Sequence, residues 1–194
     1  MLTNNFKKTD IKSPCGGIFT IYIDIINSII YKKINNPNWY RIQTKINIYK
    51  NILNNLHKIP ILGKYILEPD KIKIENDGSY YSKFISNGIR LYDIKKNTKI
   101  DSVVLEYITE KVLELKKDLN EYVIKNKLSG DWALHNLMYC IDRKKIYNVD
   151  LEGFYTYPLI HNNGNCSINY CNKRFDTLIS ILENINQVES INFK

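Results

Sequence analysis

Apolar residues change their spacing along this chain, and the order of the changes predicts an α+β fold. Residues 18–34 are rich in β-branched and aromatic side chains interrupted by DIIN, which is typical of two antiparallel strands and a turn. A second hairpin is predicted from KIKIE to SYYSKFI around Asn76, Asp77 and Gly78, because an Asp-Gly pair supplies the positive φ angles of a tight turn. The first half of the chain is therefore expected to be mainly strands.

Apolar residues recur three and four positions apart in three further segments, which predicts helices. The first helix is expected to start at Asn36 and Pro37, and the second to run from Ser102 to about Lys125. The helical sets are Ile42, Ile46, Tyr49, Leu53 and Leu56; then Val104, Leu105, Ile108, Val112, Leu115, Leu119, Tyr122 and Val123; and last Phe175, Leu178, Ile179, Leu182 and Ile185. A short hairpin from LMYCI to KIYNV across DRKK is predicted before the last helix. With 194 residues and 44% apolar composition, one folding unit with two layers is expected.

The formal charge of +8 raises nucleic acid and anionic membranes as partners. Lys outnumbers Arg, and Asn, Ile and Tyr are abundant, which is what an AT-rich coding genome of a parasite, phage or large virus produces. The basic residues are spread along the chain without a run of five. Nucleic-acid binding is therefore not favoured, although a basic surface leaves it open.

The cysteines predict neither a disulfide framework nor a zinc site. The four cysteines, Cys15, Cys140, Cys166 and Cys171, form no CxxC pair. The spacing of His161, Cys166 and Cys171 matches no common zinc motif, so these three are expected in a loop. The most apolar window, IFTIYIDIINSII, is interrupted by Asp24 and is too short for a membrane span. The sequence predicts a soluble cytoplasmic protein, in the host cytoplasm if the genome is viral.

Three polar residues near the end of the chain form a pattern suited to phosphoryl transfer. Asp131, on a loop after a predicted buried helix, is positioned to orient a substrate hydroxyl and take its proton. Asn136, five residues on, can offer an uncharged carbonyl oxygen to a magnesium ion, and Asp150 at the end of the next hairpin can complete an oxygen cage. The pattern predicts a site for a metal held together with nucleotide phosphates.

GDWALHN followed by YNVDLEGF resembles the catalytic and metal-binding loops of the protein-kinase-like superfamily. Gly130 before Asp131 is similar to the aminoglycoside and choline phosphotransferase branch, which carries HGDxxxxN and D-x-E. The resemblance implies Asp131 as catalytic residue, Asn136 and Asp150 as magnesium ligands, and Glu152 as an acidic neighbour supporting the metal or a basic substrate group. It also implies a minimal two-lobed kinase-like fold, with an N-lobe over 1–85 and a C-lobe over 86–194.

The same resemblance assigns nucleotide contacts to the first half of the chain. Gly16 and Gly17 of SPCGG stand in place of the glycine-rich loop, although G-x-G-x-x-G is incomplete and a simple hairpin turn fits as well. Lys83, Phe84 and Ile85, before the SNG turn, suit a hinge whose backbone meets adenine. Their assignment depends on the motifs downstream.

Lys32 is the expected phosphate-binding lysine, because strand alternation separates it from Lys33 and turns it towards the nucleotide cleft. Without the downstream motifs, a solvated strand lysine would be the plainer interpretation. Members of the family carry a Glu on the next helix that pairs with this lysine, whereas RIQTKINIYKNIL has no acid and places Lys45 there. Either Lys32 pairs with another acid, such as Asp150, or the phosphate clamp is incomplete and Lys45 reaches phosphate itself. Ser129 in place of the usual loop His is a milder departure.

Only 44 residues follow Asp150 (194 minus 150), too few for the helices that dock peptides in ordinary protein kinases. The sequence therefore predicts an ATP- and Mg-dependent phosphotransferase acting on a small hydroxyl-bearing acceptor. One alternative is a pseudokinase that binds nucleotide or a protein partner without turnover. Another is an unrelated fold in which Asp131 caps a turn, Asn136 satisfies loop backbone, and Asp150 and Glu152 end a strand.

Overall fold

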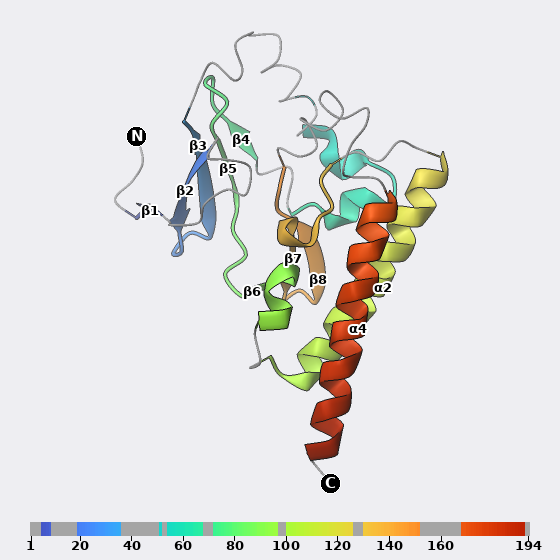
Figure 1. Cartoon of the computed structure of the whole chain (residues 1–194). Coiled ribbons are helices and arrows are strands. Elements are labelled where there is room, and N and C mark those ends of the chain that lie inside the picture. Colours follow the sequence, from blue (N-terminus) through green and yellow to red (C-terminus); the bar gives the residue numbers. More distant parts are fainter. Residues whose placement is uncertain are drawn as a thin grey trace. The chain divides into compact units, whose positions relative to one another are not determined.

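The protein has an α+β fold that divides into two units. A computed structural model describes residues 5–8, 19–35, 51, 54–67, 72–96, 100–125, 130–151 and 168–192. Contacts group Met1–His57 with Leu67–Ser86 in a first unit, and Lys58–Ile66 with Asn87–Lys194 in a second. The first unit contains a five-stranded sheet, and the second contains a three-stranded sheet and two long helices (Figure 1).

The sheet of the first unit is antiparallel in the order β1-β2-β3-β5-β4. Its strands are β1 (Lys7–Lys8), β2 (Phe19–Asp24), β3 (Ile29–Ile34), β4 (Lys73–Ile74) and β5 (Tyr80–Lys83). Both hairpins expected from the sequence are confirmed, β2 with β3 and β4 with β5. Short β1 adds an edge strand that the sequence pattern does not indicate, because two residues carry no alternation.

The turn between β4 and β5 uses a single left-handed residue. Among the described turn residues only Gly78 has a positive φ, at 92°. Asp77 has a negative φ, so the Asp-Gly pair supplies one positive φ angle and not two. The Glu75 amide donates to the Ser79 carbonyl at 2.8 Å, which closes a three-residue loop. The Asp77 carboxylate accepts hydrogen bonds from the Ser79 amide at 2.8 Å and from its hydroxyl at 3.0 Å. Asp77 therefore holds the turn through its side chain and Gly78 through its backbone.

The two faces of this sheet carry different side chains. Residues paired across antiparallel strands share a face, and Lys32 pairs with Ile21 and Tyr80. The buried side chains on that face are Phe19, Ile21, Ile34 and Tyr80. The Lys32 ammonium lies 5.5 Å from the centroid of the Tyr80 ring. Lys33 and Tyr31 lie on the opposite face, as strand alternation predicts.

The helix predicted after Pro37 falls largely outside the described residues. Leu56, its last predicted apolar position, is buried at the start of a short 3-10 helix, η2 (Leu56–Lys58). ILGKYIL forms another 3-10 helix, η3 (Leu62–Tyr65), in the second unit. The bridge from Ile66 to Asn148 joins this segment to the second sheet.

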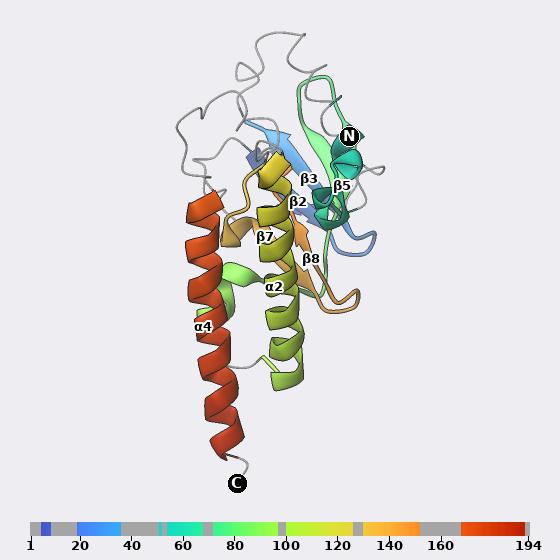
Figure 2. The ribbon, with the colours of Figure 1, turned by 90° about the vertical axis from the view of Figure 1, so that its right-hand side faces the viewer.

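The second unit pairs two long helices with a small antiparallel sheet. Helix α2 spans Ser102–Lys125 and α4 spans Ile168–Asn192, and they lie side by side in opposite directions (Figures 1 and 2). The strands, in sheet order, are β6 (Gly88–Arg90), β7 (Leu137–Cys140) and β8 (Lys145–Asn148). The predicted hairpin across DRKK is confirmed as β7 and β8.

Helix α2 has its predicted bounds because its capping residue and its apolar spacing both indicate the same segment. The Asp101 carboxylate accepts a hydrogen bond from the Val103 amide at 2.9 Å and so caps the first turn. The predicted apolar positions that are buried are Leu105, Ile108, Val112, Leu115, Leu119 and Tyr122. Phe175, Leu178 and Leu182 of α4 are buried too, so the two apolar stripes supply much of the core of this unit.

The prediction that Cys171 lies in a loop is wrong. Helix α4 begins at Ile168, and Cys171 is buried within it, only 1% exposed. Cys171, Phe175 and Leu178 follow the i, i+4, i+7 spacing of one helix face, but the polar run of Asn172, Lys173 and Arg174 hides that pattern in the sequence. Cys166 lies outside the described residues.

Strand β6 and the 3-10 helix η5 (Leu91–Lys96) are further elements that the apolar spacing does not indicate, since both are too short to display a period. Among the helices that the structure describes, none combines the length and the apolar character that crossing a bilayer requires.

Candidate functional site

The loop that carries Asp131 is anchored on both sides of that residue. Gly130 has a φ of 86°, a conformation that costs a non-glycine residue about 1–3 kcal/mol, so the Gly-Asp sequence meets a local backbone requirement. Trp132 is 0% exposed, and its ring meets that of Tyr65 edge to face at 6.1 Å. Asp131 therefore sits between a fixed turn and a buried indole.

Asp131 is itself nearly buried, with 5% of its surface exposed. Its Oδ1 accepts a hydrogen bond from the Ala133 amide at 3.0 Å. This bond closes an Asx turn, which fixes the carboxylate relative to the loop. The turn-capping role expected of an ordinary loop Asp is thus present, and any chemistry of Asp131 has to use the same carboxylate.

Asn136 lies next to Asp150, although fourteen positions separate them in the chain. Asn136 ends the 3-10 helix η6 (Leu134–Asn136), where its carbonyl accepts the Val149 amide at 2.9 Å. Its side-chain Nδ2 donates to Asp150 Oδ2 at 3.3 Å and to the Asp131 carbonyl at 3.5 Å. The three polar residues singled out in the sequence therefore form one hydrogen-bonded group.

Asn148 joins the same group and was missed by the sequence analysis. It is 0% exposed at the end of β8, its Nδ2 donates to the Asp131 carbonyl at 2.9 Å, and its Oδ1 accepts the Asp150 amide at 2.9 Å. One amide thus ties the two acid-bearing segments together. The signal available was a polar residue closing the apolar strand KIYN, two positions before Asp150.

The donor set suits a hard cation better than a soft one. Carboxylate and amide oxygens are ligands of Mg²⁺, which usually takes one or two carboxylates and fills its other positions with phosphate oxygens and water. Within the described ranges no three His, Cys, Asp or Glu side chains gather, so a closed all-protein metal cage is not formed there. Asn136 presents its amide nitrogen to Asp150, and rotating that amide would present Oδ1 to a cation beside the carboxylate.

Helix α4 lies beside the Asp131 loop at Cys171. Burial raises the pKa of the Cys171 thiol to about 11, and the negative charge of Asp131 adds to the shift. The thiol therefore stays protonated at neutral pH, and it is a packing residue next to Asp131 with no thiolate chemistry.

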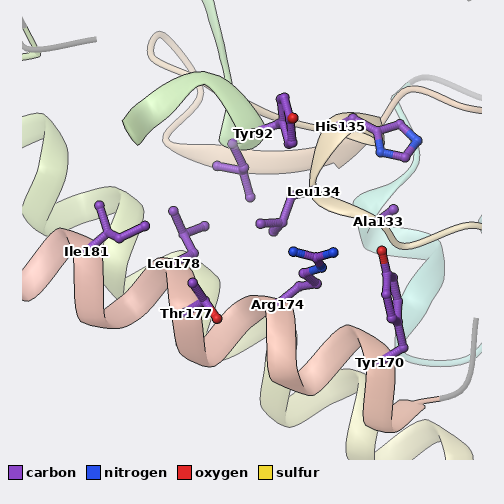
Figure 3. A pocket seen from close by; sticks show the side chains of 10 residues that line it. Tyr92, Ala133, Leu134, His135, Tyr170, Arg174, Thr177, Leu178 and Ile181 are labelled. Atoms are coloured by element: carbon purple, nitrogen blue, oxygen red, sulfur yellow. The ribbon is translucent and has the colours of Figure 1, made fainter. Parts of the chain in front are cut away.

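A cavity of about 190 Å³ is lined by α4 and by the residues that follow Asp131 and Trp132 in this loop. Its lining residues are Leu91, Tyr92, Ala133, Leu134, His135, Tyr170, Arg174, Thr177, Leu178 and Ile181. Figure 3 shows Arg174 and Tyr170 projecting from α4 towards Ala133 and Leu134, and the guanidinium lies 5.2 Å from the centroid of the Tyr170 ring. These ten residues include Arg174 and no Asp or Glu, so the cavity carries positive charge.

The nucleotide contacts expected in the first unit are brought together only in part. Lys32 lies on the buried apolar face of the sheet, whereas Lys83 pairs with Ile29 and lies on the other face. The side chains of the two lysines therefore point in opposite directions. The Phe84 amide donates to the Ser28 carbonyl at 2.9 Å, and Ile85 is buried. The predicted nucleotide contacts Gly16 and Gly17 and the alternative Lys45 lie outside the described residues. So does Glu152, the acidic neighbour predicted after Asp150.

No protein-family model matches the chain, and none of the curated proteins matches it at a significant level.

Proposed function

We propose that the protein is a minimal phosphotransferase of the protein-kinase-like type, which uses Mg-ATP to phosphorylate a hydroxyl group. The observation that carries the proposal is the hydrogen-bonded group of Asp131, Asn136, Asn148 and Asp150. These side chains come from two segments that are separated in the chain. Their proposed roles at one magnesium and phosphate site require them to lie close together. The strand-rich unit would serve as the nucleotide-binding lobe and the helical unit as the catalytic lobe.

Each residue has a defined role in the proposed reaction. Asp131 orients the acceptor hydroxyl and takes its proton as the oxygen bonds to the γ-phosphorus of ATP and ADP leaves. Asn136 and Asp150 would hold magnesium, with Glu152 in support, and the ion supplies charge neutralisation on the phosphates. Lys32 is assigned to phosphate contact. Gly16, Gly17 and the 83–85 segment are assigned to the nucleotide.

The first test is stabilisation by nucleotide. At a concentration 100 times its Kd, Mg-ATP should raise the thermal unfolding midpoint by roughly 5–10 °C, because it binds only the folded chain. Asp150→Asn should remove the magnesium-dependent part of that shift, since an amide is a weaker cation ligand than a carboxylate. Asp142→Asn, in the exposed β7–β8 turn, is the matched control and should keep the full shift. A wild-type protein unmoved by ATP, with and without magnesium, contradicts the proposal.

A nucleotide-binding protein without turnover is the second candidate. The sequence RIQTKINIYKNIL favours it, because this segment has no acidic residue in place of the Glu that the family carries on the corresponding helix. Mg-ATP stabilisation combined with no acceptor phosphorylation and no slow ATP hydrolysis would select this candidate.

The cavity beside the Asp131 loop is the proposed acceptor site, and Arg174 would make it prefer acceptors that carry a negative charge. An arginine in a partly enclosed site without acids favours an acceptor that carries a carboxylate or phosphate besides its hydroxyl. Arg174 and Tyr170 are both exposed, and the ring lies beside the guanidinium, where it would limit the orientations of the guanidinium and so lower the entropy lost when an anion binds.

Arg174→Ala should raise KM for an anionic acceptor roughly ten- to hundred-fold and leave kcat nearly unchanged, since the guanidinium holds the acceptor equally in the ground and transition states. The measurement compares hydroxyl compounds in pairs, with and without a carboxylate or phosphate. Lys173→Ala removes an equal charge from the exposed neighbouring position and should have little effect. Equal effects of the two substitutions, or preference for the neutral member of each pair, would contradict the assignment.

A further inference from the structure

Five residues from five strands form one row across the sheet of the first unit. Lys8 of β1 pairs with Tyr22 of β2, Tyr22 pairs with Tyr31 of β3, Tyr31 with Tyr81 of β5, and Tyr81 with Lys73 of β4. Directly paired residues share a face, so three tyrosines lie in line with a lysine at each end. This is the face opposite Lys32.

The tyrosine rings form a fixed aromatic ridge. Tyr31 and Tyr81 stack at 4.4 Å between centroids, Tyr22 lies 6.0 Å from Tyr31, and Phe6 meets Tyr31 and Tyr81 edge-on. Tyr31 is 5% exposed and donates its hydroxyl to Glu75 at 2.9 Å, so it supports the ridge from within. Tyr22 and Tyr81 are only half-buried, and they are the rings that a ligand can reach.

Four lysines surround this ridge on the same face. Lys33 and Lys83 lie two positions along their strands from Tyr31 and Tyr81, so they point to the same face. With Lys8 and Lys73 at the ends of the row, they make four. No ion pair links any of the four to another residue in the described part of the chain. Three carboxylates lie on or beside the face. Glu75 accepts the Tyr31 hydroxyl, Asp24 is buried and accepts two hydrogen bonds from Asn27, and Asp77 accepts two from Ser79 while its charge acts on Tyr81. The face therefore keeps an excess of positive charge.

We propose that this face binds single-stranded nucleic acid. The tyrosine face consists of Lys8, Tyr22, Tyr31, Lys33, Lys73, Tyr81 and Lys83. Bases stack on aromatic rings whatever their identity, and lysines on either side contact the phosphates of a strand that crosses the sheet. The inference does not depend on the proposed phosphotransferase activity, which uses the second unit and Lys32 on the other face of this sheet. Lys83 belongs to both assignments, but its backbone is the part assigned to the nucleotide.

Charge and aromatic content together select this ligand over an anionic membrane. A membrane surface would use the lysines, but the strongly exposed apolar side chains near them, Ile25 and Ile26, lie in the β2–β3 turn at one end of the face. In the middle of the face the half-buried rings pack on one another. Duplex nucleic acid offers phosphates without accessible base faces, so the tyrosines would add little to its affinity.

The test is fluorescence anisotropy with a labelled fifteen-nucleotide oligouridylate over a range of salt concentrations. The paired change Lys33→Glu and Lys73→Glu should weaken binding at least about ten-fold at low salt. It should also flatten the plot of log affinity against log salt by about 1.4, or 0.7 for each phosphate that is no longer neutralised. Tyr22→Leu should weaken binding about ten-fold through reduced stacking while leaving that slope unchanged.

The matched control is Lys117→Glu with Lys173→Glu, which makes the same change in net charge on exposed helix positions of the second unit. It should leave affinity within about two-fold. Thermal unfolding of every variant shows whether the sheet is intact, and Mg-ATP stabilisation should persist in all of them if the proposed function holds. No binding of the oligomer at low salt, equal weakening by both lysine pairs, or stronger binding to duplex or to phosphatidylserine vesicles would overturn the proposal.

Discussion

Replacing Asp131 by Asn is expected to lower the rate of phosphoryl transfer by about 10²–10⁴-fold, the usual contribution of a positioned proton acceptor, without unfolding the protein. An amide oxygen can still accept the Ala133 hydrogen bond that Asp131 Oδ1 accepts at 3.0 Å. The amide cannot take a proton from the acceptor hydroxyl. Asn at position 131 therefore keeps the turn and removes the chemistry.

The measurements are steady-state transfer rates and Mg-ATP stabilisation for Asp131→Asn and Asp131→Ala. Both variants should lose turnover, and the alanine variant should also be less stable, by about 1 kcal/mol for the missing turn hydrogen bond. Asp142→Asn should behave as wild type. If Asp131→Asn kept full activity, Asp131 would be a turn-capping residue only, and the fold would have to be interpreted without a catalytic role for this loop.

The sequence predicted the elements whose signals are local. Helix α2 has apolar side chains at every expected turn and an Asp at its start, and the hairpins have turn residues between alternating runs. The closeness of Asn136 to Asp150 also follows from local rules, because a hairpin between them returns the chain to where it began. Short elements such as β1 and β6 have no period and could not be predicted in this way.

Features that depend on pairing between distant segments escaped the sequence analysis. The lysines of the tyrosine face come from four strands, and only the register of β1 to β5 puts them together, so the lack of a basic run in the sequence said nothing about a basic surface. Cys171 was misassigned because polar neighbours obscured its helical spacing with Phe175. Asn148 escaped because a polar residue at a strand end is common and its partners lie on another segment.

Asn148→Leu is expected to lower the free energy of unfolding by about 2–4 kcal/mol, because it leaves the buried Asp131 carbonyl and the Asp150 amide without their close partner. Leucine has a similar volume, so little of the loss would come from a cavity. The change should also abolish magnesium-dependent stabilisation by ATP, since the two acid-bearing segments are no longer joined. Urea unfolding gives the first quantity, and thermal shifts with and without magnesium give the second.

Asn172→Leu provides the comparison that separates this effect from the loss of any amide pair. Asn172 and Asn120 exchange two hydrogen bonds, at 2.9 and 3.0 Å, between α4 and α2, but both residues are half-buried and water can replace the missing partners. Its cost should stay below about 1 kcal/mol, and its magnesium-dependent shift should be that of the wild type. A comparable loss of stability in both variants, or an intact magnesium response in Asn148→Leu, would mean that Asn148 is an ordinary core amide. The positions of Asp131 and Asp150 would then be set by Asn136, through its side-chain hydrogen bonds to both segments and the hydrogen bond from the Val149 amide to its carbonyl.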